Sequence, residues 1–220
     1  MQSAKVRKAI TILLLILIWC GASLCFGSFL VPSPIDVMNR MLVHLRDASF
    51  YQAVMMTLSR ACIGFLISYV SALGLALLFD EWKWGKDFFA PVVTLLKSVP
   101  NISFILLILI WFSREISVML IVFFILFPSF YSNFMSGLEH LDPTLKEVMI
   151  VYEQPLWYQI IKVKIPLLYS YLIASFSSGI GLAFKVGVMA EILGQVNNGI
   201  GKKLQWSYLN IDMIGVFAWT

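Results

Sequence analysis

Two lysines and a glutamate in apolar surroundings are the residues of this sequence most able to do chemistry. Lys185 lies in the middle of the apolar run 167–193, Glu191 follows it six residues later, and Lys97 interrupts the run 88–112. A lone lysine at the centre of a bilayer costs about 2.5–3.5 kcal/mol, so each lysine must face protein, water or a counter-charge. Six residues turn a helix by about 600°, which places Lys185 and Glu191 on different faces.

Two roles stay open for these side chains. They could line a polar path across a membrane, or they could make structural contacts between helices. Lys97 could also bind backbone carbonyls freed by the neighbouring Pro100, or extend toward the membrane surface. For Glu191, near the end of its run, a structural hydrogen bond is favoured over contact with a ligand. The candidate path residues are Lys97, Lys185, Met189 and Glu191.

The sequence lacks the residue patterns of catalytic and metal sites. It contains no paired carboxylates, no H-E-x-x-H and no G-x-S-x-G, and its glycine-rich stretch 194–202 has Ile200 where a phosphate-binding loop needs lysine. The three cysteines and two histidines show no ligand spacing, and the cysteines suit small buried apolar side chains. We therefore expect no enzymatic activity, no metal and no cofactor in this chain.

The composition is that of a membrane protein. Hydrophobic residues make up 60% of the 220 residues, charged residues 13%, and the mean hydropathy is +0.88, against about 45–50% apolar and 25% charged in soluble domains. Helices cross bilayers because they satisfy their own backbone groups. We predict an all-α polytopic membrane protein. The net charge of +4 is spread along the chain and gives no reason to expect nucleic acid binding.

Five apolar stretches are long enough to cross a bilayer, which takes about 20 residues. A further run begins at Met213, but its residues up to Thr220 cannot cross, so we expect the start of an incomplete sixth helix or a surface stub. The third stretch should kink at 97–101, and Arg60 in the second is expected near the outer headgroups. The predicted spans are 9–26, 52–79, 88–112, 116–135 and 167–193, with a short loop at 80–87 and small, close-packing residues at Gly64, Ser68, Ser71 and Gly74.

The N-terminus and the distribution of positive charge predict the orientation. Lys5, Arg7 and Lys8 precede an apolar run longer than a signal-peptide core and without a clean cleavage site, so we expect an uncleaved first span. With the N-terminus in the cytoplasm, eight of the 16 lysines and arginines fall inside, five outside and three within spans.

The segment after the first span predicts a helix at the outer membrane surface. Ser33 can cap a helix whose first residue is Pro34, and apolar residues then recur at helical spacing. We therefore divide the chain into residues 1–51, which hold the first span and this surface segment, and a transmembrane core of residues 52–220.

The polar segment 141–166, between the fourth and fifth spans, predicts two short amphipathic helices. Asp142 and Pro143 form a strong helix start, and Pro155 ends the first helix. The segment could rest on lipid headgroups or form a docking surface for a partner protein. The first helix carries an apolar stripe of Leu145, Val148, Met149 and Tyr152, and the second presents Leu156, Trp157, Ile160 and Ile161, with Lys162 and Lys164 on its polar side.

The motifs of this segment, taken in order, resemble the "EAA" loop of ABC-importer permeases: E-A-A, three residues, G, nine residues, I-x-L-P. The matching residues are Glu147-Val148-Met149, then Glu153, then Val163-Lys164-Ile165-Pro166. Val148 and Met149 replace the family's alanines, and Glu153 replaces a turn glycine that would adopt positive φ more cheaply. Further landmarks are similar to the nitrate, taurine and sulfonate branch: Pro32-Ser33-Pro34, Thr57 to Arg60, Lys97 to Pro100, Ala190-Glu191 and Gly199 to Gly201.

The resemblance implies the type-1 ABC importer permease architecture, in which a cytoplasmic coupling loop, here 138–166, docks on a separate ATPase. The implied partners in the cell membrane are ATPase subunits, a second permease copy forming a homodimer, an extracytoplasmic solute-binding protein and lipid. Lys97 and Lys185 favour a small anionic or polar solute, such as a sulfonate, nitrate or a vitamin precursor. The implied ATPase-coupling residues are Glu147, Val148, Met149, Tyr152, Glu153, Leu156 and Trp157.

A different class of protein also stays open. A small channel or secondary transporter could use the intramembrane lysines and glutamate as a relay and act without ATP. Solute flux without ATP, in vesicles that hold only this chain, would favour that class.

Overall fold

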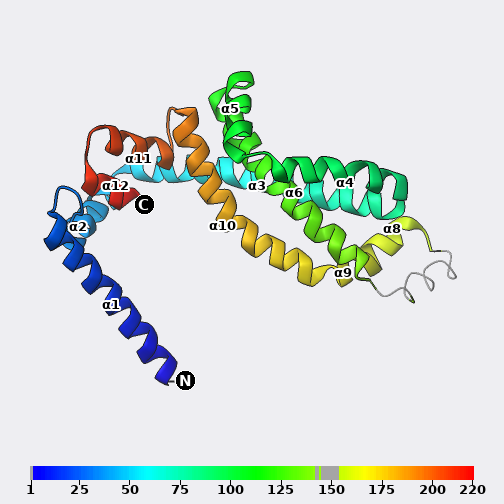
Figure 1. Cartoon of the computed structure of the whole chain (residues 1–220), viewed down its shortest axis with the longest axis horizontal. Helices are drawn as coiled ribbons and strands as arrows, with labels where there is room; N and C mark the ends of the chain where they lie inside the picture. The colour runs from blue at the N-terminus through cyan, green and yellow to red at the C-terminus, as the bar shows by residue number, and fades with distance from the viewer. Residues whose placement is uncertain (1, 142–143, 145–153) are drawn as a thin grey trace. The chain divides into compact units, whose positions relative to one another are not determined.

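The computed structural model describes residues 2–141, 144 and 154–220, and every regular element in these residues is helical (Figure 1). This confirms the predicted all-α class. The chain packs as two units: residues 1–56 together with 196–220, and residues 57–195. The predicted division at residue 51 concerns membrane topology and stays a prediction.

Four helices in the described part of the chain are long and apolar enough to cross a membrane: Val6–Phe26 within α1 (Gln2–Phe26), α3 (Ala48–Glu81), α6 (Arg114–Glu139) and α10 (Tyr169–Gly194). A fifth crossing is formed if α4 (Lys83–Ser98) and α5 (Asn101–Trp111) act as one bent pair. These are the five predicted spans. The chain is therefore a polytopic helical membrane protein.

The break between α4 and α5 is sharper than the predicted kink, with the two helices bent by 96°. Val99 and Pro100 both have extended ψ angles, of 131° and 128°. Proline clashes with a helical conformation in the residue before it, so Val99 cannot continue α4.

The predicted loop at 80–87 is wrong, since α3 ends at Glu81 and α4 begins at Lys83.

In the unit of residues 57–195, α6 is the central helix and packs against α4, α5 and α10. Half of its residues are buried, including Pro128. Aromatic rings fill the space beside it: Phe65 meets Phe130 edge to face at 5.6 Å, and Tyr69 meets Phe134 at 5.1 Å. Such edge-to-face pairs add to the free energy gained by burying the rings.

The other unit gathers α1, α2 (Pro34–Leu45), α11 (Ile200–Leu209) and α12 (Met213–Trp219), and α12 packs against both α2 and α11. The predicted start of α2 is confirmed, because the Ser33 hydroxyl accepts a hydrogen bond from the Asp36 amide at 3.2 Å. An ion pair of 3.1 Å joins Arg40 on α2 to Asp212 at the start of α12. Helix α11 was not among the predicted elements.

Gly64 on α3 confirms one of the predicted close approaches between helices. A Cβ atom added there would lie 2.6 Å from the carbonyl oxygen of Met119 on α6 and 2.8 Å from Cβ of Val122. Gly74, predicted for the same role, faces open space, since nothing lies within 4 Å of its added Cβ. Close approach is therefore needed at the first glycine only.

These two glycines give a matched test of the packing between α3 and α6. Gly64→Val should lower the free energy of unfolding by about 1–3 kcal/mol, because it forces the two backbones apart. Gly74→Val should change it by less than about 0.5 kcal/mol. Unfolding of both purified variants in detergent, followed by circular dichroism, measures the difference, and equal effects would contradict the packing described here.

Candidate functional site

A buried polar cluster joins α3, α6 and α10. The Arg60 guanidinium on α3 donates a hydrogen bond to Glu191 Oε1 on α10 at 2.5 Å and another to Glu115 Oε2 on α6 at 2.6 Å. The Thr57 hydroxyl, one turn before Arg60, lies 2.8 Å from Glu191 Oε2. Arg60 is 1% exposed and Glu191 0%. These four residues form what we name the charge cluster: Thr57, Arg60, Glu115 and Glu191.

Arginine suits this position because its planar guanidinium keeps its charge and can hold two carboxylates at once. Small residues let the helices meet here: a Cβ added to Gly187 on α10 would lie 3.3 Å from Cβ of Ala61 on α3. The structure encloses the Arg60 side chain among protein groups, and its expected depth near the outer headgroups stays a prediction. Sequence reasoning missed the pairing because its partner Glu191 lies 131 positions away.

Lys185 and Met189 are exposed on α10, whereas Glu191 is buried on another face of the same helix. The predicted separation of Lys185 and Glu191 by helix geometry is therefore confirmed. The structure brings Glu191 into the charge cluster and leaves the other three predicted path residues outside it.

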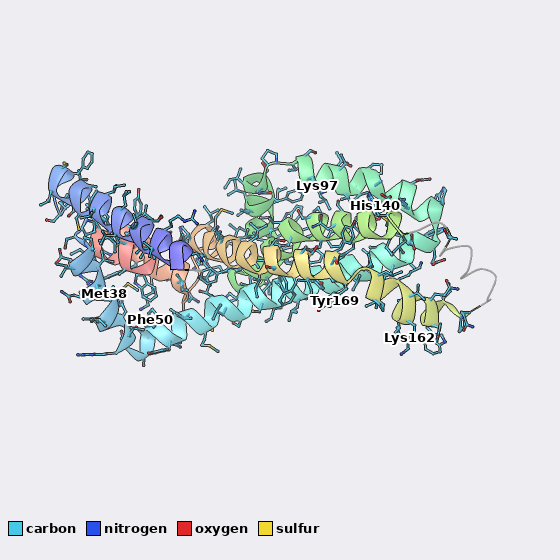
Figure 2. The ribbon with its side chains drawn as sticks, turned by 90° about the horizontal axis from the view of Figure 1, so that it is seen from below. Met38, Phe50, Lys97, His140, Lys162 and Tyr169 are labelled. Atoms are coloured by element: carbon cyan, nitrogen blue, oxygen red, sulfur yellow. The ribbon has the colours of Figure 1, made fainter. Side chains whose placement is uncertain are left out.

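Lys97, labelled in Figure 2, lies at the C-terminal end of α4. Its ammonium donates a hydrogen bond to the Ser132 hydroxyl on α6 at 2.6 Å. Toward the other end of α4, Lys86 pairs with Glu139 of α6 at 2.6 Å. Lys97 therefore contacts a side chain on a neighbouring helix, which was one of the roles left open for it.

The base of the loop before α10 is tied to the end of α3. Lys164 lies in a π-helix, η1 (Gln159–Lys164), between α8 (Leu156–Tyr158) and α9 (Ile165–Leu167). Its ammonium pairs with Asp80 at 2.5 Å and also with Glu81, and the side chain is buried. The expected placement of Lys164 on the polar side is wrong, because these carboxylates draw it inward.

Taken together, the ion pairs of Lys164 shift its pKa more than its burial does. Burial by itself lowers the pKa of Lys164, but the hydrogen bonds that its ammonium donates to Asp80 and Glu81 raise it above its ordinary value of 10.5. A lysine with a raised pKa in the folded protein stabilises the fold fully below its unfolded pKa, and this contribution disappears only as the pH rises through the folded pKa. The ion pairs of Lys164 with Asp80 and Glu81 are therefore intact at neutral pH.

Apolar side chains are exposed on the described part of the same loop. Leu156 is 57% exposed and Trp157 62%, and Ile161 on η1 is exposed as well. Lys162, also exposed, is labelled on this segment in Figure 2, and Tyr169 marks the start of α10. The other predicted coupling residues lie outside the described residues: Glu147, Val148, Met149, Tyr152 and Glu153.

The comparisons with known proteins agree with this architecture. Residues 64–219 match the model of the family "Binding-protein-dependent transport system inner membrane component". This polytopic membrane protein therefore belongs to the permeases of binding-protein-dependent ABC transporters, and the resemblance read from its motifs is confirmed.

Individual relatives are distant but cover most of the chain. A putative aliphatic sulfonates transport permease of Bacillus subtilis is 25% identical over 84% of this chain and 69% of its own length. A putative ABC transporter permease of Methanocaldococcus jannaschii is 23% identical over 89% and 75%. A riboflavin transport system permease of Chloroflexus aurantiacus is 27% identical over 86% and 72%.

The charge cluster should behave as one energetic unit. Arg60→Met should lower the free energy of unfolding by about 3–5 kcal/mol, because it leaves Glu191 charged and buried without its cation. The double variant Arg60→Met/Glu191→Met should be destabilised by at least about 1 kcal/mol less than the sum of the single variants. Unfolding in detergent measures all three, and additive effects would contradict the coupling.

The contribution of the Lys164 ion pairs to stability can be measured against a matched control on the same π-helix. Lys164→Met should lower the free energy of unfolding by about 1.5–3 kcal/mol, because it removes charge-assisted hydrogen bonds from a buried position. Lys162→Met, at an exposed position, should change it by less than about 0.5 kcal/mol. The same unfolding measurement at pH 7 compares the two, and similar stabilities would count against the tie.

Proposed function

We propose that this chain forms the solute path of an ATP-driven importer and that a separate cytoplasmic ATPase drives it by docking on loop 138–166. One observation carries the proposal: Leu156 and Trp157 are exposed on a short helix whose base is tied to α3 through Lys164. Exposed apolar side chains grouped on a polar loop favour a protein partner. The buried ion pairs would pass movement of the docked loop to the transmembrane helices.

The orientation belongs to the same proposal. We place the N-terminus in the cytoplasm, residues 27–51 outside and the loop inside, on the excess of lysine and arginine in the inner segments. The loop can then reach an ATPase from the inner face of the cell membrane. Residues 52–220 form the transmembrane core in this assignment.

The path itself requires more than one chain. Lys185 and Met189 are exposed on α10, and a lysine within a span must face water or protein. We therefore assign that face to a path shared with a second copy of the chain, and we add Lys97 to it. Glu191 would support the wall of the path from within the charge cluster.

The remaining partners and the solute follow from the family and its members. A binding protein outside the cell would deliver the solute, and ATP hydrolysis would occur on the ATPase, so this chain would have no enzymatic activity of its own. Relatives named for sulfonates and for riboflavin transport support a small anionic or polar solute.

Replacing the exposed leucine tests the docking. Leu156→Asp should abolish solute uptake driven by ATP while the chain still inserts and folds, because a charge would break the apolar contact with the ATPase. Lys162→Asp, a charge change at a nearby exposed position, should retain most of the uptake. Transport and ATP hydrolysis are measured together in vesicles that hold both subunits and the binding protein.

Two outcomes would contradict the proposal. Normal uptake in the Leu156→Asp vesicles would remove the docking role, and uptake without any ATPase would assign the chain to the ATP-independent class.

A further inference from the structure

His44 lies among aromatic rings in the unit of residues 1–56 and 196–220. Its imidazole, on α2, is nearly parallel to the ring of Phe50 at the start of α3, and the two ring centroids are 6.4 Å apart. The ring of Trp219 on α12 is closer to the imidazole, at 4.9 Å, and lies 5.3 Å from the ring of Phe50. We name His44, Phe50 and Trp219 the ring contact. It lies where α12 packs against α2.

One nitrogen of the His44 imidazole is enclosed by the protein. Nε2 is buried and has no hydrogen-bond partner among the described residues. A neutral imidazole carries an N–H donor on one of its two nitrogens, and an imidazolium carries one on both. Protonation therefore requires a charged donor at Nε2 with no acceptor beside it, which costs free energy.

Four charged groups surround His44, and their charges balance. Arg40 lies on α2 and Lys203 on α11, while Asp47 follows α2 and Asp212 precedes α12. An imidazolium would add a positive charge to this balanced set. The carboxylates are the only groups of the four that would attract it.

Both carboxylates already have partners. Asp212 Oδ2 pairs with Arg40 at 3.1 Å, and Asp212 Oδ1 accepts a hydrogen bond from the Gly215 amide at 3.0 Å. Asp47 accepts hydrogen bonds from the amide of Ser49 at 2.9 Å and from its hydroxyl at 2.7 Å. An imidazolium would have to compete with these donors for either carboxylate.

Burial, and next to it the charge of Arg40, lower the pKa of His44 below its ordinary value of 6.5, although Asp47 and Asp212 oppose the shift. A histidine with a lowered pKa in the folded protein contributes its full stability above the unfolded pKa. That contribution is lost as the pH falls from there through the folded pKa. Asp47 titrates in a more acidic range, because the hydrogen bonds from Ser49 lower its pKa below 3.8. Mild acid should therefore weaken this region through His44.

We propose that the ring contact is a proton-sensitive switch, in which neutral His44 holds α12 against α2 and protonated His44 releases it. The side from which it senses protons rests on the proposed orientation, which places α2 outside the cell. In that orientation, acid outside the cell loosens the packing between α2 and α12.

The direct test follows the imidazole signals of the purified full-length chain in nanodiscs by nuclear magnetic resonance, with isotope-labelled histidine. The chain has only two histidines, His44 and His140, and His140→Gln identifies their signals. The His44 signal should titrate below 6.5. A signal that titrates at or above this value would overturn the proposal, because the aromatic rings would then be stabilising the imidazolium.

Hydrogen exchange measures the release of α12 itself. His44→Phe keeps a ring at this position but cannot take up a proton. Between pH 7.5 and pH 5, after correction for the intrinsic exchange rate, the amides of 213–219 should exchange at least about threefold faster in the wild type, and His44→Phe should show no such increase.

A matched control and a measurement without variants keep this test decisive. His140→Gln, at an exposed position, should respond to pH like the wild type. An equal response in the wild type and His44→Phe would overturn the switch. The imidazole titration is made on the native ring contact, so it decides the proposal even if His44→Phe folds poorly.

Uptake measurements test whether the switch acts in the importer. In vesicles that hold both subunits and the binding protein, acidifying the side of the binding protein from pH 7.5 to pH 5 should lower ATP-driven uptake more in the wild type than in His44→Phe. Equal losses would overturn a role of the switch in transport. Absence of ATP-driven uptake at pH 7.5 would contradict the proposed function instead, and the titration and exchange results would still decide the switch.

Discussion

The contact between Arg60 and Glu191 is the interaction on which the transmembrane packing depends. Helices in lipid gain little from the hydrophobic effect when they associate, because the acyl chains are as apolar as their side chains. Close packing and polar contacts must hold them together instead. A buried guanidinium that joins carboxylates on two other helices supplies such a contact, and the small residues Ala61 and Gly187 beside it let α3 and α10 approach.

Local patterns predicted the helices well. The apolar runs gave the spans, Ser33 and Pro34 gave the start of α2, and Pro100 gave the break in the third span, because each of these signals acts within a few residues. The angle of that break depends on how α4 and α5 pack against α6, which no local pattern contains. Helix α11 was missed for a related reason. Its apolar stripe is weak, and contacts with other helices, which no local pattern contains, stabilise it.

The candidate site was harder to predict because its partners are distant in the sequence. Lys164 has the spacing of an exposed polar residue, and only the fold reveals Asp80 and Glu81 at the end of α3. Arg60 had one available signal. A buried arginine must have a counter-charge, and Glu191 was the acidic residue within a predicted span.

The right-angled joint at Val99 and Pro100 has a consequence for the surrounding lipid. With the N-terminus in the cytoplasm, a cytoplasmic loop after α6 requires α4 and α5 to traverse the bilayer together, since three crossings before the loop instead of four would place it on the other side. The joint then lies at depth, where the last carbonyls of α4 have no partners within the helix. Peptide groups at that depth are tolerated only against protein or water. Lipid must therefore be excluded from the joint beside Lys97, which has to face protein or water.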